Sequence, residues 1–173
     1  IVDEKGKEVD TKEVGEIIVR TTSNMIGYWN LPEETKKTLK SGWLYTGDAG
    51  FMDEDGYIYV HDRVKDMIVS GGENVYPAEV ESAIFGHEMV SDVAVIGVPD
   101  KQWGEAVKAL VVLKDNCETS EEDIINFTRQ KIAGFKTPKS VDFIKELPRN
   151  PSGKILKKEL RKPYWKGFER AIN

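Results

Sequence analysis

The stretch VAVIGVPDKQWGEAVKALVVL, residues 93–113, decides the fold of the second half of the chain. Its two apolar runs, residues 93–98 and 106–113, each have the length of a strand, and Pro99-Asp100 lies between them as a turn would. Continuous apolar runs of this length are typical of buried strands. We therefore expect a pair of buried strands here, with the neighbouring segments packed around it.

A helix is expected on the N-terminal side of this pair. Pro77 suits the first position of a helix, because its missing N–H has no partner there in any case. Val80, Ala83 and Ile84 then fall on one face, and Gly86 ends the helix. The pattern predicts an amphipathic helix that buries this face.

Shorter elements complete the second half. Ser120 is a typical N-cap for another helix, with Asp123 three residues further on. Short strands are expected at residues 67–69 and 141–144, where β-branched and aromatic side chains gather. Residues 154–162 predict a short basic helix that ends at Pro163.

The first third of the chain has a different pattern, with strands separated by turns. Strands are expected at residues 16–20, 43–46 and 57–60, and the turn at residues 53–56 ends in a glycine. Residues 32–38, which begin with a proline, predict one or two helical turns. This part is therefore expected to form a small antiparallel sheet.

The two patterns meet at Asp62-Arg63-Val64-Lys65. We predict an α+β fold with a β-rich subdomain over residues 1–62. Residues 63–173 are expected to form an α+β domain with a small, mostly antiparallel sheet and flanking helices.

Charge is unevenly distributed along the 173 residues, whose net charge is −5. Residues 134–173 contain 11 Lys and Arg against four Asp and Glu, whereas the rest of the chain is acidic. A basic end of this kind suits nucleic acid, or the phosphates of a nucleotide or coenzyme, but it is also typical of a solvated helix face. Few aromatic residues lie among these basic residues before Tyr164, so single-stranded nucleic acid is disfavoured and we expect no nucleic-acid partner.

Several classes of protein are disfavoured by composition. The longest apolar runs are far shorter than the roughly 20 residues of a membrane span, and the N-terminus lacks the pattern of a signal peptide. The single cysteine, Cys117, excludes an internal disulfide and fits a reducing compartment, so we expect a cytoplasmic protein. With only His61 and His87 beside it, no zinc site of the usual ligand number and no metal site is predicted. The missing initiator methionine suggests a piece of a longer chain.

Three charged residues stand out as candidates for a nucleotide site. Asp48 follows a predicted strand and a glycine, and its carboxylate can accept hydrogen bonds from a diol such as ribose. Arg63 comes 15 residues later, at the end of the next strand, where its guanidinium could reach the same nucleotide. Lys154 follows Ser152-Gly153 in a proline-rich segment, although the segment is no P-loop, since Pro148 stands where that motif needs glycine.

These residues lie in stretches that resemble the motifs of one superfamily. Residues 45–48 (YTGD) resemble the ribose-binding motif of the adenylate-forming enzymes, which include acyl-CoA synthetases, adenylation domains of peptide synthetases and luciferases. Residues 56–81 resemble the long hinge motif, and residues 148–155 (PRNPSGKI) the catalytic-lysine motif. The likeness covers essentially the whole chain and places it at the C-terminal part of such an enzyme.

The resemblance implies a reaction in two steps. A carboxylate attacks the α-phosphate of Mg-ATP to give an acyl-adenylate and pyrophosphate, and the thiol of coenzyme A then displaces AMP. ATP, Mg²⁺ and coenzyme A are the cofactors and co-substrates that this implies, and Mg²⁺ is expected to bind mainly to the missing N-terminal part. The phosphate loop and the carboxylate pocket of the family also belong to that part, so the chain alone is expected to be inactive.

The resemblance also implies a role for each candidate residue. Asp48 and Arg63 correspond to nucleotide-binding positions, and Lys154 to the catalytic lysine that also contacts the nucleotide. Lys65 corresponds to the hinge about which the small domain turns between the two steps. Gly71-Gly72 would approach the pantetheine arm of coenzyme A.

Finer features resemble the fatty or medium-chain acyl-CoA ligases, namely residues 99–105, 134–138 and 162–167. A fatty acid is therefore the expected substrate, and the N-terminal part of the same enzyme the expected partner. The segment ending in Lys154 also resembles sites of lysine acylation, so a lysine acyltransferase and deacylase are candidate partners. Two alternatives stay open: an adenylation domain that loads a carrier protein, and a non-catalytic basic binding module.

Overall fold

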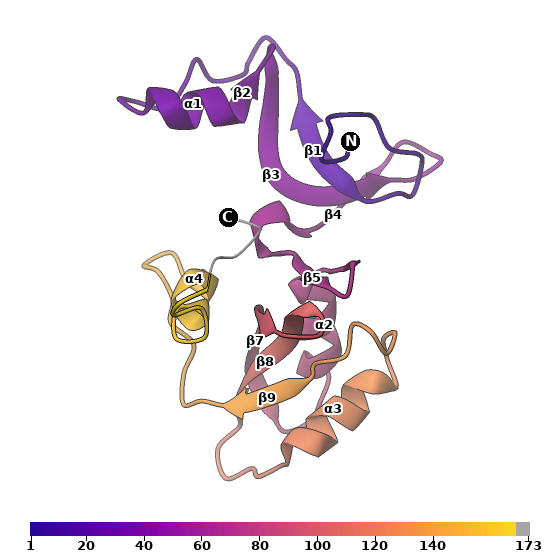
Figure 1. The fold of residues 1–173 in the computed structure, drawn as a ribbon, viewed down its shortest axis with the longest axis vertical. Coiled ribbons are helices and arrows are strands. Elements are labelled where there is room, and N and C mark those ends of the chain that lie inside the picture. Colours follow the sequence, from indigo (N-terminus) through magenta and orange to yellow (C-terminus); the bar gives the residue numbers. More distant parts are fainter. Residues whose placement is uncertain (169–173) are drawn as a thin grey trace. The chain divides into compact units, whose positions relative to one another are not determined.

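The computed structural model describes residues 1–168, which form two compact units divided between Val64 and Lys65 (Figure 1). This divide lies two residues after the boundary expected from the sequence. Among the described residues, no helix is both long enough and apolar enough to span a membrane.

The first unit is built around one long strand. This strand, β3, pairs antiparallel with β1 on one edge, and with β2 and β4 on the other edge. A short helix, α1, precedes β2. The elements are β1 (Gly15–Val19), α1 (Pro32–Thr38), β2 (Leu39–Lys40), β3 (Trp43–Met52) and β4 (Ile58–Arg63).

Little apolar surface is buried within this first unit. Val2, Ile17 and Ala49 are the hydrophobic residues that residues 1–64 bury. In contrast, the large apolar side chains at residues 57–60, in and beside β4, are all exposed. Because stability scales with the apolar area removed from water, the first unit has a small core of its own.

The second unit contains a five-stranded sheet with α-helices on both faces. Its long strands β7 and β8 pair antiparallel, and β8 also pairs with β5 and, in parallel, with β9. A 3-10 helix, η1 (Val64–Asp66), begins at the divide. The strands are β5 (Ile68–Ser70), β6 (Glu73–Val75), β7 (Val90–Asp100), β8 (Gly104–Leu113) and β9 (Ser140–Phe143).

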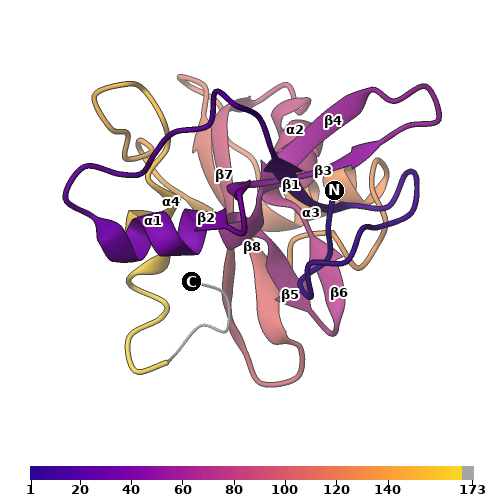
Figure 2. The same cartoon turned by 90° about the horizontal axis from the view of Figure 1, so that it is seen from above.

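Both faces of this sheet are covered, which explains the continuous apolar runs. Successive side chains of a strand point to opposite faces. Val93 and Val95 accordingly pack with α2 (Pro77–Phe85) and α3 (Glu121–Arg129) in one core, whereas Ala94 and Ile96 pack with Leu147 in another. The second core is flanked by Leu160 of α4 (Lys157–Arg161) and by Tyr164. Figures 1 and 2 show α2 and α3 on one side of β7 and β8, and α4 on the other.

Helices α2 and α3 begin where the sequence predicts. Pro77 is the first residue of α2, whose Val80 and Ile84 are fully buried. Ser120 is the N-cap of α3, and its Oγ accepts a hydrogen bond from the N–H of Asp123 at 3.1 Å. The predicted α+β class with mostly antiparallel sheets is confirmed.

The basic helix is shorter than predicted. It was expected over residues 154–162, but α4 spans Lys157–Arg161. The N–H of Lys154 donates to the side chain of Asn150 at 2.9 Å, and Ile155 forms a β-bridge with Arg149, so both residues are committed to a hairpin-like loop. Two further strands, β2 and β6, were not expected, because two or three residues give no detectable periodicity.

Candidate functional site

Asp48 and Arg63 face each other across β3 and β4. They are paired in the strand register, and Arg63 Nη1 donates to Asp48 Oδ1 at 2.8 Å. Their side chains are 35% and 51% exposed, so solvent and ligands can reach the pair. Within residues 1–168 the second oxygen of Asp48, Oδ2, accepts no hydrogen bond, which leaves it available to a hydroxyl group.

A β-bulge in β3 presents this carboxylate. Glu16 pairs with Ala49 and Ile18 pairs with Tyr45, so residues 46–48 lie opposite Ile17 alone. Gly47 adopts a positive φ of 72°, a conformation that side chains rarely allow. Bulges of this kind change the direction of a side chain, and here the bulge against β1 lies at Asp48, which stays paired with Arg63 of β4.

Hydrogen bonds hold the bulge in place. Thr46 Oγ1 donates to the carbonyl of Ile17 at 2.7 Å and accepts from the N–H of Asp48 at 3.1 Å. The N–H of Gly47 donates to Glu16 Oε1 at 3.0 Å. The unpaired backbone groups of the bulge therefore have side-chain partners, and Asp48 is presented on an ordered support.

Lys154 lies in a loop that is organised by one side chain. Asn150 Oδ1 accepts hydrogen bonds from the N–H of Ser152 at 3.0 Å, from its hydroxyl at 2.8 Å and from the N–H of Lys154 at 2.9 Å. Gly153 has a φ of 83°, which reverses the chain direction there. Lys154 itself is exposed, and its ammonium has no ion pair among residues 1–168. The result is an ordered loop that carries an available cation.

The loop is anchored to the edge of the sheet. Arg149 donates through Nη1 to the carbonyl of Gly153 at 2.6 Å and through Nη2 to Asp92 Oδ2 at 2.6 Å. Asp92 belongs to β7, so the guanidinium ties the loop to the strand. This pair fixes the base of the loop that carries Lys154.

Gly71 and Gly72 form the turn between β5 and β6. Both have positive φ, at 63° and 90°, as a two-residue hairpin turn of the I′ type requires. A Cβ on Gly71 would lie 2.6 Å from Trp103 Cε3, so packing alone demands glycine there. A Cβ on Gly72 would meet nothing within 4 Å. Gly72 is therefore the position of the two that leaves room for a ligand.

Lys65 lies in η1, at the start of the second unit, and is exposed. The next residues, Asp66 and Met67, are already buried. The chain thus passes from the divide into the core of the second unit within one residue. The structure pairs Asp48 with Arg63 in the first unit; Lys65, Gly71, Gly72 and Lys154 belong to the second.

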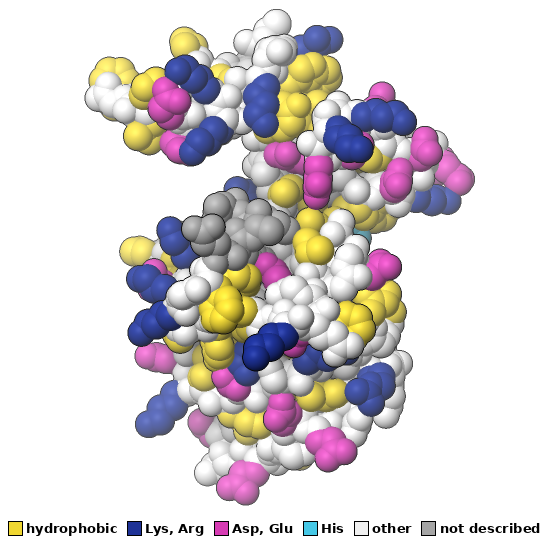
Figure 3. All heavy atoms as spheres, in the orientation of Figure 1, with side chains coloured by type: hydrophobic (Ala, Val, Ile, Leu, Met, Phe, Trp, Pro, Cys, Tyr) yellow, Lys and Arg dark blue, Asp and Glu magenta, His cyan; other side chains and the backbone are white. Residues whose placement is uncertain are grey.

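Much of the basic C-terminal charge is neutralised within the second unit. Lys136 pairs with Glu79, Lys157 with Glu81 and Arg161 with Asp66, at 2.7, 2.7 and 3.0 Å. On the visible face of this unit, acidic side chains lie among the basic ones (Figure 3). This pairing weakens the case for a basic surface that binds nucleic acid, because paired cations attract phosphates less.

A buried lysine also holds the C-terminal segment. Lys108 is 8% exposed, and its Nζ donates to Asp142 Oδ1 at 2.7 Å. Burial and the hydrogen bond to Asp142 raise the pKa of Tyr164 to about 12. Burial alone would raise the pKa of Asp142, but the hydrogen bonds from Lys108 and Tyr164 outweigh it and lower that pKa.

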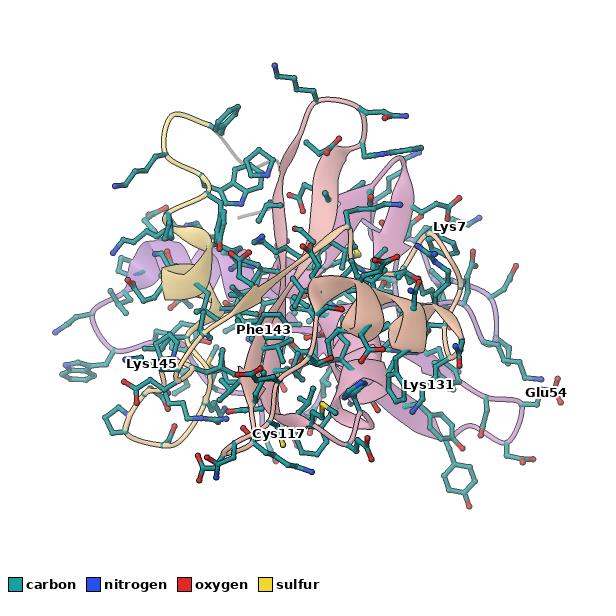
Figure 4. The ribbon with its side chains drawn as sticks, turned by 90° about the horizontal axis from the view of Figure 1, so that it is seen from below. Lys7, Glu54, Cys117, Lys131, Phe143 and Lys145 are labelled. Carbon is teal, nitrogen blue, oxygen red and sulfur yellow. The ribbon has the colours of Figure 1, made fainter. Side chains whose placement is uncertain are left out.

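Metal-ligating side chains, the cysteine and the histidines also lie among the described residues. Among residues 1–168, no group of three or more His, Cys, Asp or Glu is placed to hold a metal ion. Cys117 is a half-buried free thiol in the loop between β8 and α3 (Figure 4). His87 is buried, with Nε2 3.3 Å from Asp123 Oδ2 and its ring edge-on to Phe127, as in a structural contact between helices.

Comparison with known proteins shows the family of the chain. Residues 79–154 match the model of the AMP-binding enzyme C-terminal domain. The chain is 46% identical over 173 residues to ScoC, a fatty acid–acyl-carrier-protein ligase of Streptomyces coeruleorubidus, covering all of this chain and 33% of ScoC. It is 51% identical over 150 residues to FadD13, a long-chain-fatty-acid–CoA ligase of Mycobacterium tuberculosis, covering 87% of this chain and 30% of FadD13.

A solved structure shows the same fold. The crystal structure of ATP-bound MatB from Rhodopseudomonas palustris is 39% identical, with a TM-score of 0.87 over 97% of this chain and 34% of MatB. The chain thus spans about a third of the length of the relatives it matches. It belongs to the adenylate-forming enzymes and corresponds to their C-terminal part. The predicted family is confirmed, while the roles of the individual residues stay predictions.

Sequence reasoning did not identify three residues that support the candidates. Asn150 organises the Lys154 loop, Asp92 anchors it, and Trp103 packs on Gly71. For Asn150 a signal was present, since asparagine two residues before Ser152 often forms a turn with its own side chain. For Asp92 and Trp103 the sequence offered none, because their partners are distant in the chain.

Asn150→Ala should loosen the loop that carries Lys154, because three hydrogen bonds lose their acceptor. At about 1 kcal/mol for each net hydrogen bond, amide hydrogen exchange of Ser152 and Lys154 should rise at least about tenfold. Asn150→Asp keeps the acceptor and serves as the control, with exchange close to that of the native chain. Equal exchange in Asn150→Ala would show that another contact orders the loop.

Tyr164 should titrate at about 12, measured by the difference in ultraviolet absorbance between the native chain and Tyr164→Phe. Because the pKa is raised on folding, the Tyr164–Asp142 bond stabilises fully below pH ~10 and is lost as pH rises towards 12. The lowered pKa of Asp142 has the opposite sense: its contribution is present above pH ~4 and is lost in acid. A difference titration centred near 10 would contradict the described contact.

Proposed function

We propose that this chain works as the C-terminal part of an AMP-forming acid–thiol ligase that converts a carboxylate, ATP and coenzyme A into a thioester. The observation that carries the proposal is the loop of Lys154, an exposed ammonium on a support fixed by Asn150 and Arg149. A cation held without an ion pair on an ordered loop is suited to meet an anion that arrives with the substrate.

In this proposal Asp48 binds the ribose of the nucleotide. Its Oδ1 is held by Arg63, which fixes the rotamer of the carboxylate. Its Oδ2 accepts from the ribose hydroxyl groups, and the remaining donors of Arg63 reach the ribose or the phosphate. The bulge at residues 46–48 supplies the exposure that these contacts need.

Lys154 acts in the first step. As the carboxylate attacks the α-phosphate, negative charge is shared between the two, and the ammonium stabilises it without leaving its loop. Preorganised groups of this kind lower the activation free energy by about 3–4 kcal/mol. In the second step Lys65 is the pivot, and the turn at Gly71-Gly72 approaches the pantetheine arm, where Gly72 offers open space.

Mg²⁺ is assigned to no residue of this chain, because no suitable group of ligands is present among residues 1–168. When bound with ATP it would neutralise phosphate charge. We place its ligands, the phosphate loop and the carboxylate pocket in the part of the relatives that this chain does not cover. The chain alone is accordingly proposed to bind ATP weakly and to be inactive. Its location in the cytoplasm and the acylation of Lys154 stay predictions.

A fatty acid is the proposed substrate, supported by FadD13 at 51% identity. ScoC, 46% identical over the whole chain, favours a carrier protein as a second candidate for the thiol. The two differ in the second step only. In one case the thiol of free coenzyme A attacks the acyl-adenylate and displaces AMP, and in the other the thiol of a phosphopantetheinylated carrier protein does so.

Lys154→Ala in the longer enzyme should slow adenylation about 100- to 1,000-fold, which corresponds to the loss of one preorganised charge. The measurement is carboxylate-dependent exchange of pyrophosphate into ATP. Lys158→Ala, an exposed lysine in α4, is the matched control and should keep the native rate. A native rate of pyrophosphate exchange in Lys154→Ala would contradict the catalytic role of this lysine.

To identify the thiol substrate, the longer enzyme is given purified acyl-adenylate together with either free coenzyme A or a holo carrier protein. The proposal predicts thioester formation at least about tenfold faster with coenzyme A, a preference worth about 1.4 kcal/mol. A faster reaction with the carrier protein would establish the second candidate instead.

A further inference from the structure

An ion pair joins the segment beside the divide to the helix that follows the Lys154 loop. Arg161 Nη1 lies 3.0 Å from Asp66 Oδ1, although the two residues are 95 positions apart in the chain. Their side chains are 14% and 12% exposed, so this pair is far more buried than the pair of Asp48 and Arg63. Removal of one partner of a buried pair leaves the other charge without compensation.

One side of this pair is the start of the second unit. Asp66 ends η1, directly after Lys65 and two residues after the divide. Ile68, which is fully buried, follows as the first residue of β5. A partner that holds Asp66 therefore holds the first buried turn of the unit and confines bending to the residues before it.

The other side of the pair is connected to Lys154. Arg161 is the last residue of α4, and the N–H of Leu156, the N-cap of α4, donates to the carbonyl of Pro148 at the base of the loop at 2.8 Å. With five residues, α4 is too short to be stable alone, so its position comes from tertiary contacts. Those contacts include the two least exposed ion pairs of the C-terminal segment, Arg161 with Asp66 and Lys157 with Glu81.

We propose that Arg161 is a positioning residue, which through Asp66 holds residues 66–70 and the Lys154 loop together as one rigid body. A turn of the chain at Lys65 then moves Lys154 while its position in the second unit stays the same. This inference rests on the proposed function for its consequence in catalysis. In this role Arg161 acts through its partner Asp66 and not on the reacting atoms.

The coupling is tested first in the 173-residue chain, by hydrogen exchange of residues 66–70 and 150–156 followed by mass spectrometry. Arg161→Ala and Asp66→Asn should each raise exchange about tenfold at both segments, since loss of a buried charged hydrogen bond exposes them together. The double variant should exchange no faster than the worse single variant, because the two changes remove the same interaction. Lys162→Ala is the control: this neighbour is the C-cap of α4, is exposed, pairs with Glu159, and should leave both segments unchanged.

Arg161→Lys keeps the charge with fewer donors and should show a smaller rise, about threefold. If the amides of Arg161→Ala exchange fast throughout β7, the second unit has unfolded in that variant. Arg161→Lys is then the variant that tests the proposal. Exchange at residues 150–156 that stays native in Arg161→Lys and Asp66→Asn overturns the proposal. So does an increase confined to α4.

The consequence for catalysis is tested in the longer enzyme by pyrophosphate exchange. Arg161→Ala should lower kcat of adenylation about tenfold and leave KM for ATP within about twofold, with partial recovery in Arg161→Lys. A native kcat in Arg161→Ala contradicts the positioning role. If the native enzyme itself catalyses no exchange with any carboxylate, the proposed function fails, and hydrogen exchange alone then decides the coupling.

Discussion

The pairing of β7 with β8 is the constraint on which the second unit depends. The two strands pair without a shift from Asp92–Val112 to Asp100–Gly104, after a bulge between Val90 and Asp92, and their apolar side chains alternate between the two faces of the sheet. Each face must therefore be covered, one by α2 and α3 and the other by the C-terminal segment. The position of Lys154 follows from this, because its loop is part of the chain that covers the second face.

The free edge of β7 is closed by side chains. The N–H of Val95 donates to Glu81 Oε1 at 2.7 Å, and Trp165 Nε1 donates to the carbonyl of Gly97 at 2.9 Å. Unpaired strand edges invite association with other chains, and these contacts block it. The same edge holds Asp92, so one strand both protects the sheet and anchors the loop of Lys154. Around the loop, Arg149, Lys157 and Arg161 are thus fixed in ion pairs, whereas Lys154 forms none with the residues that the structure describes.

Local rules predicted most of the elements, and long-range contacts account for the rest. Pro77, Ser120 and the apolar runs at residues 93–98 and 106–113 act through the backbone near them, so their effect can be read from the sequence. The candidates Asp48, Arg63 and Lys154 were identifiable because the motifs around them resemble a known family. The bulge that presents Asp48 depends on the register between β1 and β3, and the late start of α4 depends on the Asn150 side chain. Neither is visible in hydrophobic periodicity.

We propose that the carboxylate of Asp48 binds the sugar of a nucleotide while the ammonium of Lys154 binds its phosphate. This arrangement can be tested by a crystal structure of the longer enzyme with a non-hydrolysable acyl-adenylate analogue. We expect Asp48 Oδ2 at about 3 Å from a ribose hydroxyl and Lys154 Nζ at about 3 Å from an α-phosphate oxygen or its neighbouring carbonyl. An analogue bound with Asp48 and Lys154 facing different cavities would contradict it.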